Sequence, residues 1–198
     1  MKVYGLKKKL KVTWNAPVTL GLVFLCFIAT LLGKLTSGRS DQVLFMTYHS
    51  SLASPLTYVR FFTHILGHSG WEHFISNASY LLLLGPMLEE KHKSSRILEV
   101  ILATALITGL VNYVLFPGVA LCGASGVVFA FILLTSFTGF REGEIPITFI
   151  LVAVIFIGQQ VFEGLTLKDN VSNLSHIIGG VVGSILGYNL NRKSKYGY

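Results

Sequence analysis

Ser125 is the residue of this chain that most readily suggests covalent chemistry. Its hydroxyl stands between Gly123 and Gly126, in an uncharged stretch that runs from Leu121 to Phe131. A serine in an apolar helix usually packs against a neighbour or hydrogen-bonds to its own backbone. It acts as a nucleophile where an imidazole lies within hydrogen-bond reach and donors are ready to receive an oxyanion. The remaining chain must therefore bring such groups to the same place.

His176 is the candidate general base. Small residues follow it within two helical turns, and they would let another helix approach its face closely. These residues are Gly179, Gly180 and Gly183. Gly126 offers a similar smooth patch beside Ser125. The sequence therefore predicts two closely packed helices, one with the hydroxyl and one with the imidazole.

His73 and Asn77 are candidate donors to an oxyanion. They are four residues apart, so on a helix both side chains project from one face. The backbone N–H of Ser125 is a third candidate. The first amides of a helix lack partners within it, and the helix dipole favours an anion there.

No carboxylate is available to complete a catalytic triad. Asp41 and Asp169 are the only aspartates, and both lie outside the apolar segments. The predicted chemistry is therefore that of a Ser–His dyad, with the base oriented by packing. Phe129, one turn after Ser125 on the same face, is expected to support the imidazole of His176.

The composition indicates a membrane protein. Of the 198 residues, 52% are hydrophobic and 13% are charged, whereas a soluble domain has about a quarter of its residues charged. The net charge of +7 comes from short basic clusters beside apolar segments, which favours contact with lipid headgroups over binding of nucleic acid. Cys26 and Cys122 offer neither a disulfide framework nor the spacing of a metal site.

Six apolar segments make the predicted fold an all-α bundle of six transmembrane helices in a single domain, residues 1–198. Residues 100–140 hold no charge and would be about 60 Å long as one helix, about twice the hydrocarbon core, so they must fold back at Pro117-Gly118. The amphipathic segment Leu56–Leu66 is too short to cross and is expected in a membrane-associated first loop. The predicted spans are Val12–Gly33, Phe74–Leu88, residues 100–116, Gly123–Phe140, Ile145–Phe162 and Val171–Asn191.

The distribution of Lys and Arg predicts the orientation. If both termini are cytoplasmic, the outer segments hold four of the 16 Lys and Arg residues (Lys34, Arg39, Arg60 and Lys168) and the inner segments hold the other twelve. Residues 1–11 then form a basic cytoplasmic N-terminus, with no cleavage site after the first span, and residues 192–198 form a cytoplasmic tail. The second, fourth and sixth spans all begin on the outer side. Their first turns bring the four candidate site residues to one depth, where polar groups within a bundle usually mark function.

Three motifs in this order resemble those of the rhomboid family of intramembrane serine proteases. They are His73-Phe-Ile-Ser-Asn77, Gly123-Ala-Ser125-Gly126 and Ser175-His176-Ile-Ile-Gly179-Gly180-Val-Val-Gly183, and the resemblance extends from about Leu56 to Tyr188. It implies that Ser125 is the nucleophile and His176 the general base. It also implies that the Ser125 amide, His73 and Asn77 form the oxyanion site.

The resemblance also implies a class of substrate, and two positions of this chain depart from the family pattern. Family members cleave single-pass membrane proteins near the outer membrane face. The segment from Arg60 to His68 is similar to the family's first loop, where Arg60 is expected to anchor the chain. Many members have Trp-Arg where this chain has Val59-Arg60, and many have Tyr at the position of Phe129. The Phe keeps the ring and loses the hydroxyl, and neither departure changes the dyad.

The same residues are also compatible with several other functions. A non-catalytic membrane chaperone or binding scaffold on the same fold is the main alternative. A metal-binding or transport protein would use His64 and His68 together with His73, and Cys122 is a rival nucleophile. The chain holds no HExxH motif and no pair of aspartates within its spans, which disfavours the corresponding metallo- and aspartyl proteases. The expected partners are the bilayer and a membrane-protein substrate, with neither a cofactor nor a metal.

Overall fold

The computed structural model describes residues 12–136, 145, 147–166 and 170–196, and in the last two helices it describes the side chains of 147–155, 158 and 175–189. This part of the chain is helical and has no strand. Its elements are α1 (Pro17–Leu35), a π-helical turn η1 (Asp41–Phe45), α2 (Pro55–Thr63), a 3₁₀ turn η2 (His64–Leu66), α3 (Trp71–His92), α4 (Ser94–Leu115), α5 (Ser125–Ser136), α6 (Ile147–Thr166) and α7 (Asn170–Tyr196). The predicted all-α class is confirmed.

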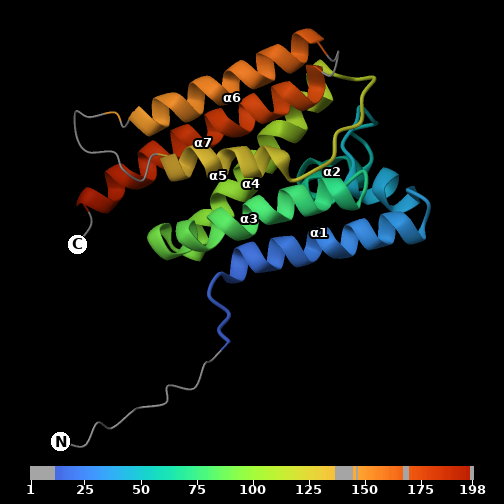
Figure 1. The fold of residues 1–198 in the computed structure, drawn as a ribbon. Helices are drawn as coiled ribbons and strands as arrows, with labels where there is room; N and C mark the ends of the chain where they lie inside the picture. Colours follow the sequence, from blue (N-terminus) through green and yellow to red (C-terminus); the bar gives the residue numbers. More distant parts are fainter. Residues whose placement is uncertain (1–11, 137–144, 146, 167–169, 197–198) are drawn as a thin grey trace, which may run out of the picture.

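The helices pack around α5 (Figure 1). Helix α1 lies along α3, α3 contacts α5, and α5 makes its most extensive contact with α7, while α6 covers the outer side of α7. Helix α4 contacts α1, α2, α3, α5 and α7, and so closes the bundle from one side. Seven of the 12 residues of α5 are buried, as expected of a helix that is apolar on all sides and central in the fold.

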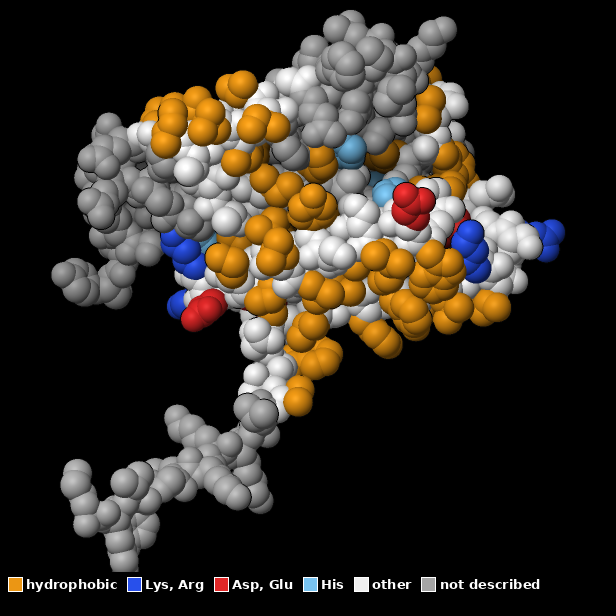
Figure 2. Space-filling model, in the orientation of Figure 1, with side chains coloured by type: hydrophobic (Ala, Val, Ile, Leu, Met, Phe, Trp, Pro, Cys, Tyr) orange, Lys and Arg blue, Asp and Glu red, His pale blue; other side chains and the backbone are white. Residues whose placement is uncertain are grey.

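The outside of the bundle is apolar, as a lipid environment requires. Large hydrophobic side chains such as Phe24, Leu83 and Val154 are more than half exposed. Figure 2 shows hydrophobic side chains across the middle of one face, with Lys, Arg and acidic side chains toward its two ends. Within the described residues, two helices are long and apolar enough to cross a membrane, α1 and α4, and α5 is a shorter apolar helix. The count of six spans therefore remains a prediction.

Sequence patterns located most helices and missed several boundaries. Pro17 occupies the first turn of α1 and Pro55 that of α2, positions where the missing N–H of proline does no harm. Helix α1 therefore begins at Pro17 rather than at Val12. Residues 137–140, the predicted end of the fourth span, lie outside the described residues.

The predicted end of the second span, at Leu88, is wrong. Helix α3 continues to His92, and Glu89 is buried within its last turns. The carboxylate accepts hydrogen bonds from the Thr19 amide (2.6 Å), the Thr19 hydroxyl (2.7 Å) and the Val18 amide (3.3 Å). The first amides of α1 have no partners within their own helix, so Glu89 caps α1 and is satisfied inside the bundle.

The first loop, residues 36–70, is ordered by its own polar side chains. The guanidinium of Arg60 is buried, donates to the Tyr48 hydroxyl (2.6 Å) and to Ser50 Oγ (2.9 Å), and lies 4.3 Å from the centre of the Tyr48 ring. Thr57 Oγ1 donates to the carbonyl of Ser51 (2.7 Å). The expected contact of Arg60 with its own loop is therefore present, and the loop packs against α4 through α2.

Candidate active site

Ser125 is the first residue of α5. The carbonyl of Ala124 accepts the amide of Val128 (3.0 Å), so the helix starts at the serine and the Ser125 amide belongs to its first turn. Gly123 has a φ of +126°, and a Cβ there would lie 2.8 Å from Cε1 and 2.9 Å from Nε2 of His73. A glycine is required at this position both for its backbone angle and for the close approach of the ring. The imidazole of His73 therefore lies against the backbone two residues before the serine.

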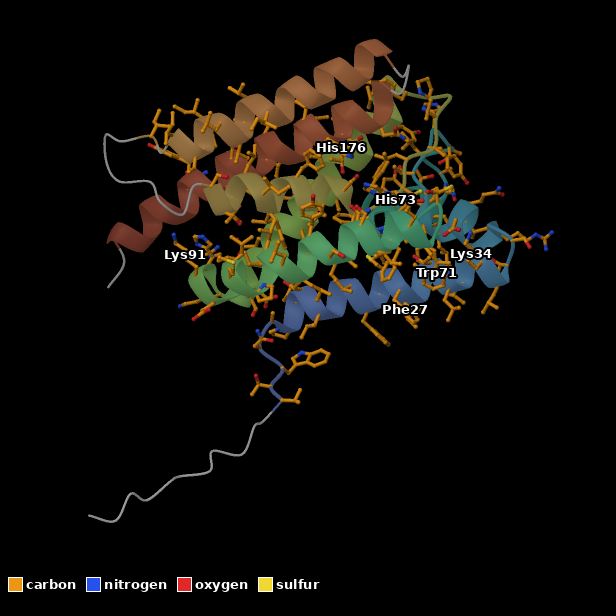
Figure 3. All side chains as sticks on the ribbon, viewed as in Figure 1. Phe27, Lys34, Trp71, His73, Lys91 and His176 are labelled. Atoms are coloured by element: carbon orange, nitrogen blue, oxygen red, sulfur yellow. The ribbon has the colours of Figure 1, made fainter. Side chains whose placement is uncertain are left out.

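His176 faces the same turns of α5. Its imidazole is stacked on the ring of Phe129, with centroids 4.2 Å apart and an interplanar angle of 5°. A Cβ on Gly126 would lie 3.6 Å from the carbonyl oxygen of Ser175. The neighbours of Ser125 and His176 in sequence are thus neighbours in space. Figure 3 shows His73 and His176 near the same end of the bundle, with Lys91 at the other end.

Close packing of α5 and α7 depends on glycines of α7 more than on Gly126. A Cβ on Gly179 would lie 2.9 Å from Gly126 Cα, and one on Gly183 would lie 2.6 Å from Ala130 Cα. By contrast, a Cβ on Gly126 would make an ordinary contact, 3.4 Å from Thr108 Cγ2. The expected clearance at Gly126 is therefore supplied mainly by Gly179 and Gly183. Gly180 also leaves room for α5, because a Cβ there would lie 3.0 Å from Cδ1 of Leu133.

His73 and Asn77 lie on one face of α3, as their spacing predicts. Asn77 is buried, and its Nδ2 donates to the carbonyl of His73 (3.1 Å). Nδ1 of His73 is 3.2 Å from Ser69 Oγ, while its Nε2 edge faces Gly123. A neutral His73 that accepts from Ser69 would carry its proton on Nε2, on the side of Ser125.

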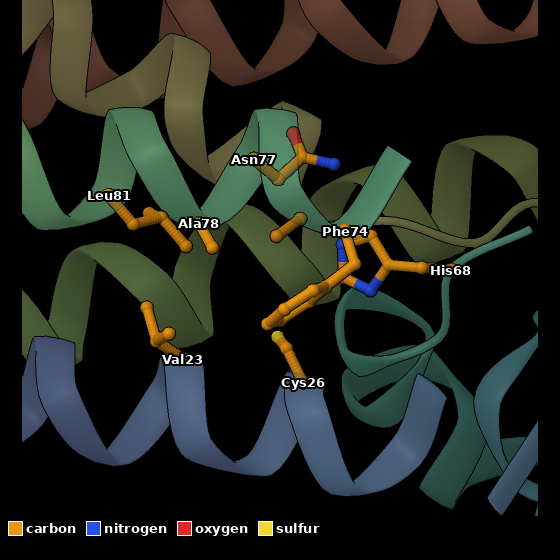
Figure 4. Close-up of a pocket in the computed structure, with 8 residues that line it drawn as sticks. Val23, Cys26, His68, Phe74, Asn77, Ala78 and Leu81 are labelled. Atoms are coloured by element: carbon orange, nitrogen blue, oxygen red, sulfur yellow. The ribbon is translucent and has the colours of Figure 1, made fainter. Parts of the chain in front are cut away.

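A narrow pocket lies between α1 and α3 (Figure 4). His68 lies at its edge, with its ring 4.9 Å from that of His73. Burial lowers the pKa of His68 to about 4, and the nearby His73 adds to this effect. His68 is therefore neutral at pH 7. The lining residues are Val23, Cys26, His68, Phe74, Asn77, Ala78, Leu81 and Ala124.

Cys122 is a poor rival to Ser125. It lies three residues before the helix start. Burial raises the pKa of its thiol to about 11, with a further contribution from the charge of Asp41. The thiolate is the reactive form of cysteine, and almost none is present at neutral pH.

The three histidines of the first loop and α3 do not gather around a common point. His64 is buried, with Nδ1 3.1 Å from the carbonyl of Arg60 and Nε2 3.2 Å from Thr108 Oγ1. Burial lowers its pKa to about 4. Within the described residues, no three His, Cys, Asp or Glu side chains form a group that could hold a metal ion.

Sequence reasoning overlooked a polar stripe on α4. Thr104, Thr108 and Asn112 are spaced by four residues and are all buried. They face the first loop, at His64 and Thr47, and the start of α5, at Gly126. Polar residues at helical spacing in an uncharged span were the available signal.

Comparison with known proteins places this arrangement in a family. The family model of the rhomboid domain matches residues 55–193. The chain is 32% identical to mouse Rhomboid-related protein 2 over 158 residues, which covers 69% of this chain and 52% of that protein. It is 28% identical to Rhomboid protease GlpG of Haemophilus influenzae, covering 86% and 89% of the two chains, and 25% identical to the Yersinia pestis GlpG, covering 87% and 62%.

The matches cover different shares of this chain and of its relatives. The chain spans about half the length of mouse Rhomboid-related protein 2 and 39% of the Caenorhabditis elegans Rhomboid-related protein 1. The matched rhomboid domain contains all three motifs, and it covers more than half of the chain. The chain therefore belongs to the rhomboid family, whose members are integral membrane proteins.

Proposed function

We propose that this protein is an intramembrane serine endopeptidase that cleaves the transmembrane segments of single-pass membrane proteins. Ser125 is the nucleophile and His176 the general base, and the cut falls near the outer face of the membrane. The chain crosses the bilayer six times and keeps both termini in the cytoplasm. The name of the Haemophilus influenzae relative, Rhomboid protease GlpG, agrees with this activity.

One observation supports the proposal above the others: the stack of His176 on Phe129, one turn after Ser125. A ring held flat against α5 has little freedom to rotate, which is what a base without a carboxylate partner needs. The carbonyl of Ser175 also lies close to Gly126, the residue after the serine, since a Cβ on Gly126 would be 3.6 Å from its oxygen.

The site residues suggest how each step proceeds. The hydroxyl of Ser125 attacks the scissile carbonyl while its proton passes to an imidazole nitrogen of His176. Negative charge develops on the carbonyl oxygen, and the Ser125 amide, the ring N–H of His73 and the second N–H of the Asn77 amide are the donors that stabilise it. The imidazolium then protonates the leaving amine, and water releases the acyl group by the same route in reverse.

The proposal is tested with purified protein in liposomes and a fluorescent single-pass substrate. Wild-type protein is expected to cleave it, and Ser125→Ala and His176→Ala are each expected to lower kcat by at least about 1000-fold. His73→Ala and Asn77→Ala should reduce kcat by about 100-fold each with a small change in KM, because oxyanion donors act in the transition state.

Cys122→Ala provides the matched control and should keep full activity. Cleavage that survives in Ser125→Ala would contradict the mechanism, and loss in Cys122→Ala with retention in Ser125→Ala would assign the nucleophile to the thiol. Wild-type protein that binds the transmembrane peptide without cutting it would favour the non-catalytic scaffold.

A further inference from the structure

The loop that leads into Ser125 has little packing of its own. This nucleophile loop, residues 117–124, follows α4, and its first part (residues 117–120) is exposed. A Cβ on Gly118 would meet nothing within 4 Å. Side-chain burial therefore does not fix the loop there, and its position depends on hydrogen bonds.

Backbone hydrogen bonds tie the nucleophile loop to the first loop. Thr47 and Leu121 form an isolated antiparallel bridge and exchange both N–H···O bonds, each 2.9 Å long. Two residues later, the Gly123 amide donates to the carbonyl of His64 (2.9 Å). The backbone is thus held on both sides of Cys122, immediately before the serine.

Asn112 joins these two loops from α4. Its side chain is buried, with 1% of its surface exposed, and Nδ2 donates to the carbonyl of Thr47 (3.1 Å) and to that of Val119 (3.1 Å). Two carbonyl partners fix the orientation of the amide, because the opposite rotamer would place oxygen against oxygen. Oδ1 is buried and finds no donor among the residues that the structure describes. An unpaired buried acceptor costs free energy. The two bonds that Nδ2 donates offset this cost, and they are the interactions that a polar side chain provides here.

We propose that Asn112 is a positioning residue for hydrolysis: its amide holds the nucleophile loop against the first loop and thereby sets Ser125 relative to His73 and His176. The inference rests on the proposed function, because it assigns Asn112 a role in that same site. Without the two donated bonds the Thr47–Leu121 bridge loses its support from α4. The serine would then shift while its own side chain and the dyad stay intact.

The first test compares two substitutions. Asn112→Leu removes both donors at similar volume, and a displacement of about 1 Å at the reacting atoms is expected to lower kcat by about 100-fold with little change in KM. Asn112→Asp keeps the shape but turns a carboxylate oxygen toward two carbonyls, so its loss should be at least as large. Thr30→Val is the matched control. Thr30 is equally buried and donates one bond to the carbonyl of Cys26 (2.8 Å), within α1 and outside both loops, so kcat should stay unchanged.

A rescue experiment separates positioning from general stability. Residues that exchange both bonds of an antiparallel bridge have Cα atoms about 5.5 Å apart, within the range of a disulfide. Thr47→Cys with Leu121→Cys, added to Asn112→Leu in a Cys122→Ala background, would replace the lost support by a covalent link. Oxidation should recover kcat by at least about tenfold, and reduction should remove the gain.

Alkylation of Cys122 tests, without reference to activity, whether Asn112 holds the nucleophile loop against the first loop. A maleimide should react with Cys122 about tenfold faster in Asn112→Leu than in wild type or Thr30→Val, because opening of the loop exposes the thiol. The adduct is mapped by mass spectrometry. An unchanged alkylation rate would show that Asn112 does not hold the nucleophile loop. A kcat within about twofold of wild type in Asn112→Leu would overturn the positioning role. If wild-type protein cleaves no substrate, the proposed function fails, and the alkylation rate still decides whether Asn112 holds the loop.

Discussion

The imidazole of His176 and the ring of Phe129 lie face to face, with centroids 4.2 Å apart and planes 5° from parallel. Phe129 is one turn beyond Ser125 on α5, so the contact connects the orientation of the proposed base to the helix that carries the proposed nucleophile. Stacked ring pairs contribute about 0.5–1.5 kcal/mol beyond the area that they bury. In the proposed dyad, which has no carboxylate, this contact would orient the imidazole.

Phe129→Leu should therefore lower kcat by up to about tenfold, since a branched aliphatic side chain leaves the imidazole free to rotate. Phe129→Tyr keeps the stack and should keep the activity. Phe62→Leu, at an exposed ring of α2, serves as the control. Equal activity of Phe129→Leu and wild type, measured as initial rates at saturating substrate, would contradict an orienting role for the ring.

Gly179→Ala should separate α5 from α7. The new Cβ would lie 2.9 Å from Gly126 Cα, where backbone and not a flexible side chain must give way. A loss of about 1–3 kcal/mol in the free energy of unfolding is expected, together with a fall in kcat. Gly21→Ala in α1, where a Cβ meets nothing within 4 Å, should be neutral or slightly stabilising. Thermal unfolding in detergent gives the comparison, and a Gly179→Ala protein as stable as Gly21→Ala would show that the helices are not in contact there.

Glu89→Gln should weaken the bundle at the end far from Ser125. The amide side chain can accept from only one oxygen and loses the charge that favours the start of α1, so unfolding becomes easier by about 1–2 kcal/mol. Thr19→Val removes one of the same hydrogen bonds and should show part of the loss. The kcat of both variants should match wild type, and a selective loss of kcat in Glu89→Gln would contradict a capping role.

Acidification should destabilise the protein through His64 and His68. Burial lowers the pKa of both groups from the usual 6.5 to about 4, so between these values the unfolded chain binds protons that the folded chain excludes. The free energy of unfolding therefore falls as the pH drops through this window, by about 2 kcal/mol per histidine between pH 7.5 and pH 5, and does not depend on these groups above it. His68→Phe, which keeps a ring beside His73, should remove about 2 kcal/mol of the pH-dependent loss. A drop as large as that of wild type would show that His68 is not the group that titrates.

Much of the helical fold could be predicted because it depends on local patterns. Uncharged runs located α1, α4 and α5, and the Pro117-Gly118 turn separated the last two. The predicted end at Leu88 is too early because a cluster of charges, which begins here at Glu89, normally ends an apolar helix. The partners of Glu89, Thr19 and Val18, are about 70 residues away in sequence. No pattern along the chain shows that the amides at the start of α1 need an acceptor from α3.

The candidate site was also predicted where it depends on local patterns and missed where it depends on distant partners. The spacing of His73 and Asn77 and the glycines after His176 pointed to faces of helices. In the structure His73 lies against Gly123 and Gly179 lies against Gly126, the two glycines that bracket Ser125 in the sequence. Asn112 was overlooked because its partners are backbone carbonyls of two loops, and a backbone carbonyl leaves no trace in the residue types. The smaller part that Gly126 plays in this packing has a related cause, because the contact depends on how α5 and α7 cross.

The most direct measurement of the central claim is the site and pH dependence of labelling by a fluorophosphonate, a probe that reacts with activated serines. In wild-type protein the adduct should map by mass spectrometry to Ser125 alone, at a rate that falls on acidification as His176 takes up a proton. His176→Ala should show no labelling above background, while Cys122→Ala should react like wild type. Labelling at another residue, or equal labelling of Ser125 in wild type and His176→Ala, would contradict the account.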